Sequence, residues 1–91
     1  MQYELSEIDF DILNVLYFVE PFSKILEEVD APPKIVADCL KHLIAKKMVV
    51  AMRFDEQKQD YVKSFIFDSD DMHAYSYLAT KEGLLAHNGR L

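Results

Sequence analysis

The sequence predicts a single α+β domain in which three helices precede a three-stranded antiparallel sheet and a short C-terminal helix. Apolar residues recur at helical spacing up to about residue 47, and from Val49 onward the spacing changes to the alternation of strands. Prolines and runs of acidic or amide residues separate these segments. The chain has 91 residues, the size of one domain, so residues 1–91 are assigned to a single unit.

The first helix is expected over Glu7–Val19. Ser6 precedes it as an N-cap, and the acidic residues of the first turn complement the helix dipole. Its apolar stripe consists of Ile8, Ile12, Val15, Leu16 and Val19. The helix is expected to end at Glu20-Pro21, because the residue before a proline is pushed out of the helical region.

A short and a long helix follow, separated by the break Asp30-Ala31-Pro32-Pro33. Pro21 suits the first position of the short helix, since its fixed φ is preorganised for a helix. The long helix is expected over Pro33–Lys47, where the lysines at its end complement the dipole. The inward-facing residues of the two helices are Phe22, Ile25, Leu26, Val29, Val36, Leu40, Leu43 and Ile44.

Three strands are expected in the second half, over Val49–Phe54, Tyr61–Phe67 and His73–Ala79. Two polar turns separate them. Thr80 can cap a last short helix from Lys81 to about His87, which Gly83 weakens.

The stretch Phe22–Leu43 resembles the helix-turn-helix of bacterial and archaeal winged-helix transcription regulators, the MarR/ArsR-like group. Asp30 stands at the turn, and apolar residues occupy the recognition helix at Val36, Leu40 and Leu43. Ile44–Val49 looks like the junction to the wing, and Tyr77–Leu84 resembles the entry into the helix after the wing. The resemblance spans roughly residues 6–87.

This resemblance implies a winged helix-turn-helix fold, with the helix-turn-helix at about residues 21–47 and the wing region at about 49–79. It also implies a DNA-binding transcription regulator that acts as a dimer. The chain departs from the family at Lys47, where a glycine is usual, and at Asp38, where a basic residue is common. The segment 54–79 is also longer than a minimal wing.

The charge distribution favours the middle of the chain as a contact surface for double-stranded DNA. The formal net charge is −6, yet residues 31–60 hold six basic and four acidic side chains. Arg53 and Lys63 are expected to share one face of the sheet. The outward residues of the long helix and the wing give the expected DNA-binding set Pro33, Lys34, Ala37, Lys41, His42, Arg53, Lys58 and Lys63. The long helix has no Arg, Asn or Gln to read bases, so a merely solvated helix face is the alternative.

Apolar residues on both faces of the second strand predict that something besides its own core covers the sheet. A second copy of the chain is the simplest cover, because two-fold dimers are the commonest assembly. The expected dimer or partner interface consists of Tyr61, Phe65, Phe67, Tyr75 and Tyr77. Two alternatives stay open: a protein–protein interaction module without DNA binding, and aromatic residues that fold back on the first or last helix.

Other function classes find no support in the sequence. No nucleophile–base set or phosphate-binding glycine loop is present, so an enzyme is not expected, and neither is a cofactor. Cys39 is expected to be a small buried thiol, and His42, His73 and His87 surface residues that bind no metal. The sequence shows neither an apolar run long enough to cross a membrane nor a secretory signal, which makes the cytoplasm the expected location.

Overall fold

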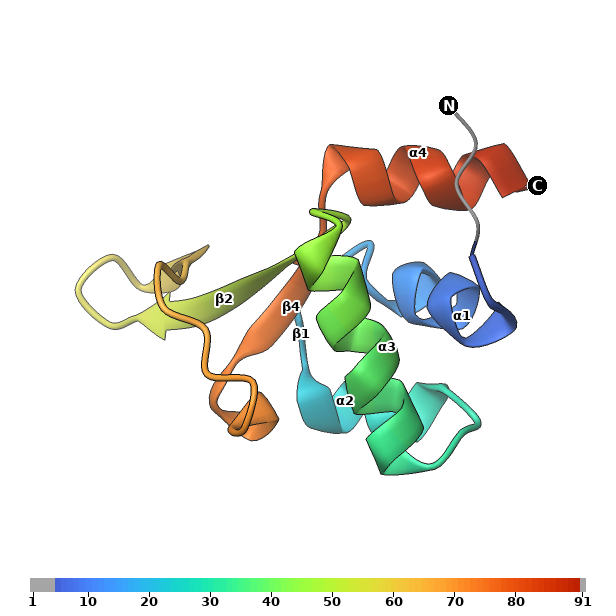
Figure 1. The fold of residues 1–91 in the computed structure, drawn as a ribbon. Helices are drawn as coiled ribbons and strands as arrows, with labels where there is room; N and C mark the ends of the chain where they lie inside the picture. Colours follow the sequence, from blue (N-terminus) through green and yellow to red (C-terminus); the bar gives the residue numbers. More distant parts are fainter. Residues whose placement is uncertain (1–4, 91) are drawn as a thin grey trace.

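The computed structural model describes residues 5–90, and within them the chain forms an α+β unit of four helices and one four-stranded antiparallel sheet (Figure 1). The α+β class expected from the sequence is thereby confirmed. The elements are α1 (Glu7–Val15), β1 (Glu20–Pro21), α2 (Phe22–Glu28), α3 (Pro33–Ala45), β2 (Val49–Asp55), β3 (Asp60–Lys63), the 3-10 turn η1 (Met72–Ala74), β4 (Ser76–Ala79) and α4 (Lys81–Arg90).

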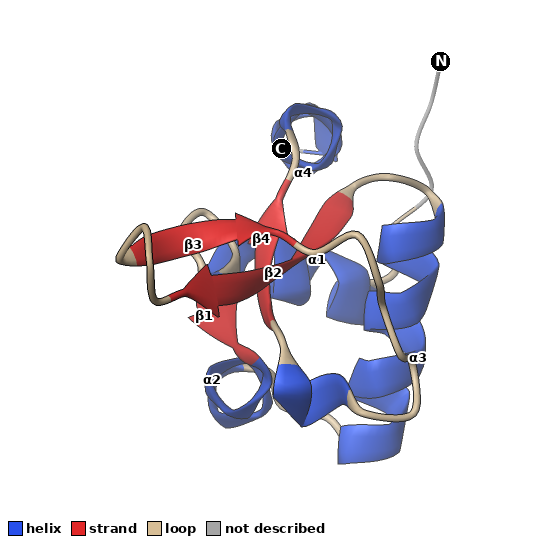
Figure 2. Ribbon diagram, turned by 90° about the vertical axis from the view of Figure 1, so that its left-hand side faces the viewer, coloured by secondary structure: helices blue, strands red, loops and turns tan. Residues whose placement is uncertain are grey.

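The strands are ordered β1-β4-β2-β3 in the sheet, so the last strand of the chain lies between the first two. In the register, Tyr77 of β4 pairs with Glu20 of β1, and Leu78 pairs with Val50 of β2. Figure 2 shows the strands gathered on one side of the molecule, with α1 and α3 on the other. The β2–β3 hairpin projects away from α1 and α4 (Figure 1).

One face of the sheet and the inner stripes of the helices form a single core. Strands β2 and β4 contribute Val49, Ala51, Tyr77 and Ala79 to it. The helices contribute Ile12, Leu13, Leu16, Phe22, Ile25, Val29, Val36, Leu40 and Leu43. Tyr77 is the largest fully buried side chain, and its hydroxyl donates a 2.8 Å hydrogen bond to the Met72 carbonyl. Burial also raises the pKa of the Tyr77 phenol.

Helix α1 begins as expected and ends earlier. The Ser6 hydroxyl accepts a hydrogen bond from Asp9 N–H, and the Asp9 carboxylate accepts one from Ser6 N–H, which forms a capping box. The helix ends at Val15 instead of Val19, and the Leu16 carbonyl accepts the Ala79 N–H at 2.9 Å. Glu20-Pro21 forms the edge strand β1, where proline is tolerated, so Pro21 is the N-cap of α2 and not its first residue as expected.

The second and third strands are shorter than the sequence predicts, and a fourth strand, β1, was not predicted at all. The expected strand Tyr61–Phe67 ends at Lys63, after which Ser64 N–H makes one more bond to the Ala51 carbonyl at 3.0 Å. The expected strand His73–Ala79 begins only at Ser76, because Met72–Ala74 form a 3-10 turn. The segment between β3 and η1 is consequently a loop.

The end of α3 explains how the chain turns without the usual glycine. The helix ends at Ala45 and not at Lys47 as expected, because Lys47 adopts the left-handed conformation with φ 64°. Lys47 N–H bonds to the Ile44 carbonyl at 3.0 Å, and Met48 N–H bonds to the Leu43 carbonyl at 2.9 Å. These two bonds form a Schellman motif, in which the left-handed position normally favours glycine.

Helix α4 is anchored at its first turn and reaches Arg90, beyond the expected end at His87. Thr80 caps it as predicted, because its hydroxyl accepts the Gly83 N–H at 3.1 Å. A Cβ at Gly83 would collide with the Met48 carbonyl, so the residue that weakens the helix lets α4 approach the end of α3.

His87 is buried, and the expectation of a surface histidine was wrong. Its ring stacks on Phe10 at a centroid distance of 4.2 Å, and its Nδ1 lies 2.8 Å from the Tyr17 hydroxyl. Its Nε2 has no hydrogen-bond partner within residues 5–90. The burial depends on α1 and α4 packing together, which joins residues about seventy positions apart.

Candidate nucleic-acid interface

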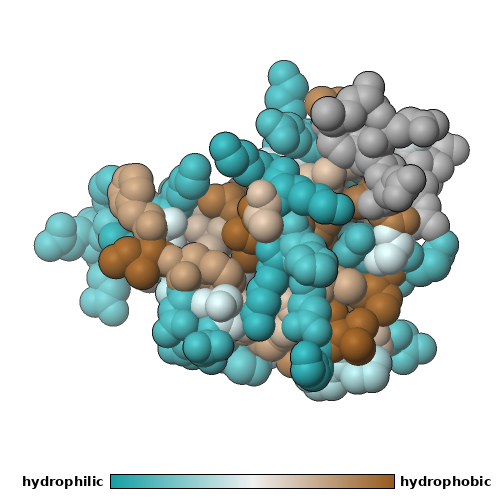
Figure 3. Space-filling model, viewed as in Figure 1, coloured by the Kyte–Doolittle hydropathy of each residue, from teal (hydrophilic) through white to brown (hydrophobic). Residues whose placement is uncertain are grey.

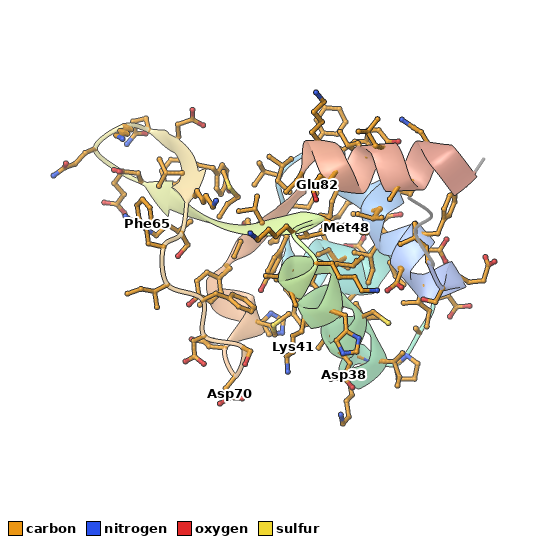
Figure 4. All side chains as sticks on the ribbon, turned by 45° about the horizontal axis from the view of Figure 1, so that its top comes forward. Asp38, Lys41, Met48, Phe65, Asp70 and Glu82 are labelled. Carbon is orange, nitrogen blue, oxygen red and sulfur yellow. The ribbon has the colours of Figure 1, made fainter. Side chains whose placement is uncertain are left out.

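The outer face of α3 is a polar stripe that carries two of the expected contact residues. Since Val36, Leu40 and Leu43 turn into the core, helical spacing places Lys34, Asp38 and Lys41 on the opposite face. Figure 4 shows Asp38 and Lys41 projecting from α3 on the side away from α4, the helix that carries Glu82. Hydrophilic side chains cover the front of this helix in Figure 3.

One of the two lysines on this stripe is paired within the helix. Lys34 Nζ lies 3.0 Å from Asp38 Oδ2, one helical turn away. This hydrogen bond lowers the pKa of the Asp38 carboxyl, which therefore stays ionised at neutral pH. Both side chains are exposed, so the pair contributes little to stability. Its effect is to offset the positive charge of Lys34 on the surface that would face DNA.

A hollow of about 280 Å³ lies between the end of α3, the edge of β2 and the loop after β3. We call it the cleft. Its lining residues are Ile44, Lys47, Val49, Val50, Ala51, Lys63, Ser64, Phe67 and Thr80. Lys47 reaches it from the end of α3, and Lys63 reaches it from β3. Neither lysine forms a salt bridge within the part of the chain that the structure describes. The cleft therefore combines an apolar floor with two uncompensated cations.

The expected pairing of Arg53 and Lys63 on one face of the sheet was wrong. Lys63 stands opposite Met52, whereas Arg53 stands opposite Val62. Residues directly opposite each other share a face, and successive residues alternate, so the two cations lie on opposite faces. Arg53 borders a second hollow of about 350 Å³ with Ser64, Phe65, Ile66 and Tyr75.

The other expected DNA-contact residues are only partly available. Pro33 and His42 are exposed on α3, and Lys58 is exposed in the turn between β2 and β3. Ala37 is half-buried and packs against the core. Lys47 was not among the expected DNA-contact residues, because its place in the cleft depends on the left-handed turn after α3, which the sequence does not indicate.

The five aromatic residues expected to form a partner interface do not form one surface. Tyr77 is buried in the core, so it offers nothing to a partner. Phe67 and Tyr75 are half-buried, and Phe67 packs on Tyr75 at a centroid distance of 5.2 Å. These three rings are thus covered from within the chain, with Tyr77 also facing Phe22 of α2 rather than the first or last helix.

The two remaining aromatic residues of that set are exposed. Tyr61 is edge-on to exposed Phe54, at a centroid distance of 5.3 Å. Phe65 is 96% exposed, and its neighbour Ile66, which was not among the five expected residues, is 78% exposed. Phe65 projects from the loop beside the hairpin in Figure 4.

The described residues show no metal-binding group of three or more His, Cys, Asp or Glu side chains. Cys39 is half-buried, and burial raises the pKa of its thiol. His42 and His73 are exposed, as expected. Among these residues no helix has the length and apolar character needed to cross a membrane.

Comparison with models of protein families, with curated proteins and with solved structures finds no match to this chain.

Proposed function

We propose that this chain is a winged-helix protein that binds double-stranded DNA and regulates transcription. The observation that carries the proposal is the cleft between α3 and the β2–β3 hairpin, with Lys47 and Lys63 at its edges. The order α2, α3, β2, β3 is that of a helix-turn-helix followed by a wing. A recognition helix and a wing that flank one cleft are suited to the two sides of a DNA backbone.

In the proposed complex, α3 lies in the major groove and the hairpin lies along the adjacent backbone. Lys41 on the outer face of α3 reaches one phosphate, and Lys47 and Lys63 hold the backbone that passes the cleft. Lys58 in the turn reaches a further phosphate. Because α3 offers no Arg, Asn or Gln, phosphate contact supplies most of the affinity and base readout little.

The acidic side chains of the N-terminal third favour one orientation of the protein on DNA. Residues 1–30 hold eight acidic side chains and one basic one, and they include α1 and α2. DNA is repelled from these helices and attracted to the α3–hairpin face, although the net charge is −6.

The test is a salt titration of binding to a generic DNA duplex, followed by fluorescence anisotropy. Four phosphate contacts predict a slope of log K against log salt of about −3.6, since each contributes about −0.9. Lys47→Glu and Lys63→Glu should each weaken binding and make the slope shallower. Asn14→Glu, a charge change at an exposed position of α1, from which the hairpin projects away, is the control and should leave the affinity and the slope unchanged. Absence of binding at about 50 mM salt overturns the proposal.

The exposed pair Phe65 and Ile66 favours a second candidate, a winged-helix interaction module that does not bind DNA. Large exposed apolar groups next to each other are typical of a protein-contact surface. The same titration separates the two candidates, because the module predicts no salt-dependent binding to DNA.

A further inference from the structure

Strand β3 forms one edge of the sheet, and the hydrogen bonds show which of its backbone groups face outward. Ser64 N–H bonds to the Ala51 carbonyl, so the pair Ala51–Ser64 is a hydrogen-bonded pair. Such pairs recur every second residue in an antiparallel ladder. Val62 and Asp60 therefore direct their backbone groups to β2, and Tyr61 and Lys63 direct theirs away from the sheet.

The outward groups are only partly protected. The Tyr61 N–H is covered by the Asp60 carboxylate, whose Oδ1 accepts it at 2.8 Å. Within residues 5–90, the N–H and carbonyl of Lys63 have no partner. Unpaired N–H and carbonyl groups along a strand edge are a template for another strand.

The chain places its most exposed apolar side chains directly after this open edge. Phe65 and Ile66 follow β3, separated from it only by Ser64. The chain bends at Phe65, where the Ser64 hydroxyl bonds to the Ile66 carbonyl, so the two side chains lie at the end of the edge, next to the position of a strand paired with β3. The open edge and the two apolar side chains therefore form one surface, which we call the β3 edge.

We infer that the β3 edge pairs antiparallel with the β3 edge of a second copy of the chain, joining two four-stranded sheets into one. The charged residues of β3 favour one register between the two copies. With Val62 opposite Val62 of the second copy, Lys63 faces the Tyr61 ring and Asp60 faces Ser64, and the free Lys63 N–H of each copy donates to the Tyr61 carbonyl of the other. Each lysine then lies beside an aromatic ring, and no like charges are opposite.

The two neighbouring registers are less favourable. Only every second residue of β3 directs its backbone groups outward. The register between the two copies can therefore change only by two residues at a time, with odd residues always opposite odd residues. One step places Lys63 opposite Lys63, where the like charges repel each other. The step in the other direction places Asp60 opposite Val62 and takes Phe65 out of the pairing.

This inference goes beyond DNA binding and is tested without DNA. Sedimentation velocity over a concentration series should show a species of about twice the 10.6 kDa of one chain. Lys63→Pro removes the outward N–H without removing a bond to β2, and should give a monomer with an unchanged circular dichroism spectrum. The double variant F65S/I66S should also be a monomer. A monomeric wild-type chain at every concentration, or a dimer that persists in Lys63→Pro, overturns the inference.

Single cysteines identify the register, in a C39S background that removes the native thiol. Val62→Cys should form a disulfide between copies, because a non-hydrogen-bonded pair places the Cα atoms about 4.5 Å apart. Tyr61→Cys and Lys63→Cys are matched controls whose own counterparts lie beyond the roughly 7 Å that a disulfide spans. Crosslinking of either control in place of Val62→Cys overturns this register, and no crosslink at any position overturns the pairing.

Discussion

The Thr80 hydroxyl donates a 2.7 Å hydrogen bond to the main-chain carbonyl of Lys47 and accepts the Gly83 N–H at 3.1 Å. The Thr80 N–H bonds to the Met48 carbonyl at 2.9 Å. One residue thus joins the end of α3, the end of β4 and the start of α4. The position of Lys47 at the cleft depends on this junction.

Thr80→Val should destabilise the fold, since it keeps the shape of the side chain and removes both hydroxyl bonds. The expected loss is about 1–2 kcal/mol in the free energy of unfolding, typical of a lost N-cap. Urea denaturation measures it. Thr80→Ser retains the hydroxyl and should lose much less. Equal stability of Thr80→Val and the wild type would contradict the role assigned to the hydroxyl.

Lys47→Gly should raise stability and weaken DNA binding at the same time. Glycine relieves the left-handed strain at φ 64°, for a gain of about 0.5–1 kcal/mol, and removes one cation from the cleft. Urea denaturation and anisotropy measure the two effects. Gln59, with φ 51° in the hairpin turn, provides the control: Gln59→Gly should stabilise similarly without changing DNA affinity. If both variants bind DNA as the wild type does, the cleft is not the contact.

Alanine substitutions at the two glycines of α4 should change the stability of the protein in opposite directions. Gly83→Ala drives a Cβ into the Met48 carbonyl and should cost about 1–3 kcal/mol or more, because the backbone must move. Gly89→Ala meets open space and should stabilise the helix by up to about 1 kcal/mol. Thermal unfolding of both variants measures the difference. A tolerated Gly83→Ala would show that α4 is not packed as described.

Tyr17→Phe should destabilise the packing of α4 on α1. It removes the hydrogen bond to His87 Nδ1 and leaves a buried nitrogen unpaired, at a cost of about 1–3 kcal/mol. His87→Phe keeps an aromatic ring against Phe10 and removes both ring nitrogens. A double-mutant cycle measures the coupling, and Tyr17→Phe should cost less in the His87→Phe background. Additive effects would mean that the two side chains do not interact.

Cys39 should react slowly with thiol reagents in the folded protein. Burial raises the pKa of its thiol, so near pH 8 less of it is the reactive thiolate than in a free cysteine. Dithionitrobenzoate kinetics measure the rate in buffer and in urea. The rate in urea should be higher, and equal rates would contradict the burial of this thiol.

Local signals in the sequence predicted the helices and their caps. Ser6 and Thr80 cap helices as expected, and Val36, Leu40 and Leu43 face the core. These features depend on residues within a few positions of each other. β1 has only two residues and no periodicity, and it exists because β4 pairs with it. His87 is buried by Phe10 and Tyr17, at the other end of the chain.

The candidate site was only partly predictable for a similar reason. Lys34 and Lys41 were found from helical spacing alone, but the partner of Lys34 changes its contribution. The faces of Arg53 and Lys63 depend on the register across the hairpin, which pairs even residues of β2 with odd residues of β3. The length of the turn sets that register, and residue types in the two strands do not specify it.

The place of β4 in the sheet also has a consequence for synthesis of the protein. β1 and β2 are both made before β4, yet both pair with that strand, which spans Ser76–Ala79. Until that segment leaves the ribosome, the apolar faces of the earlier elements have no strand to close over them. The sheet is therefore incomplete until β4 is made, and we expect a product that ends before Ser76 to aggregate or be degraded rather than to form a smaller domain.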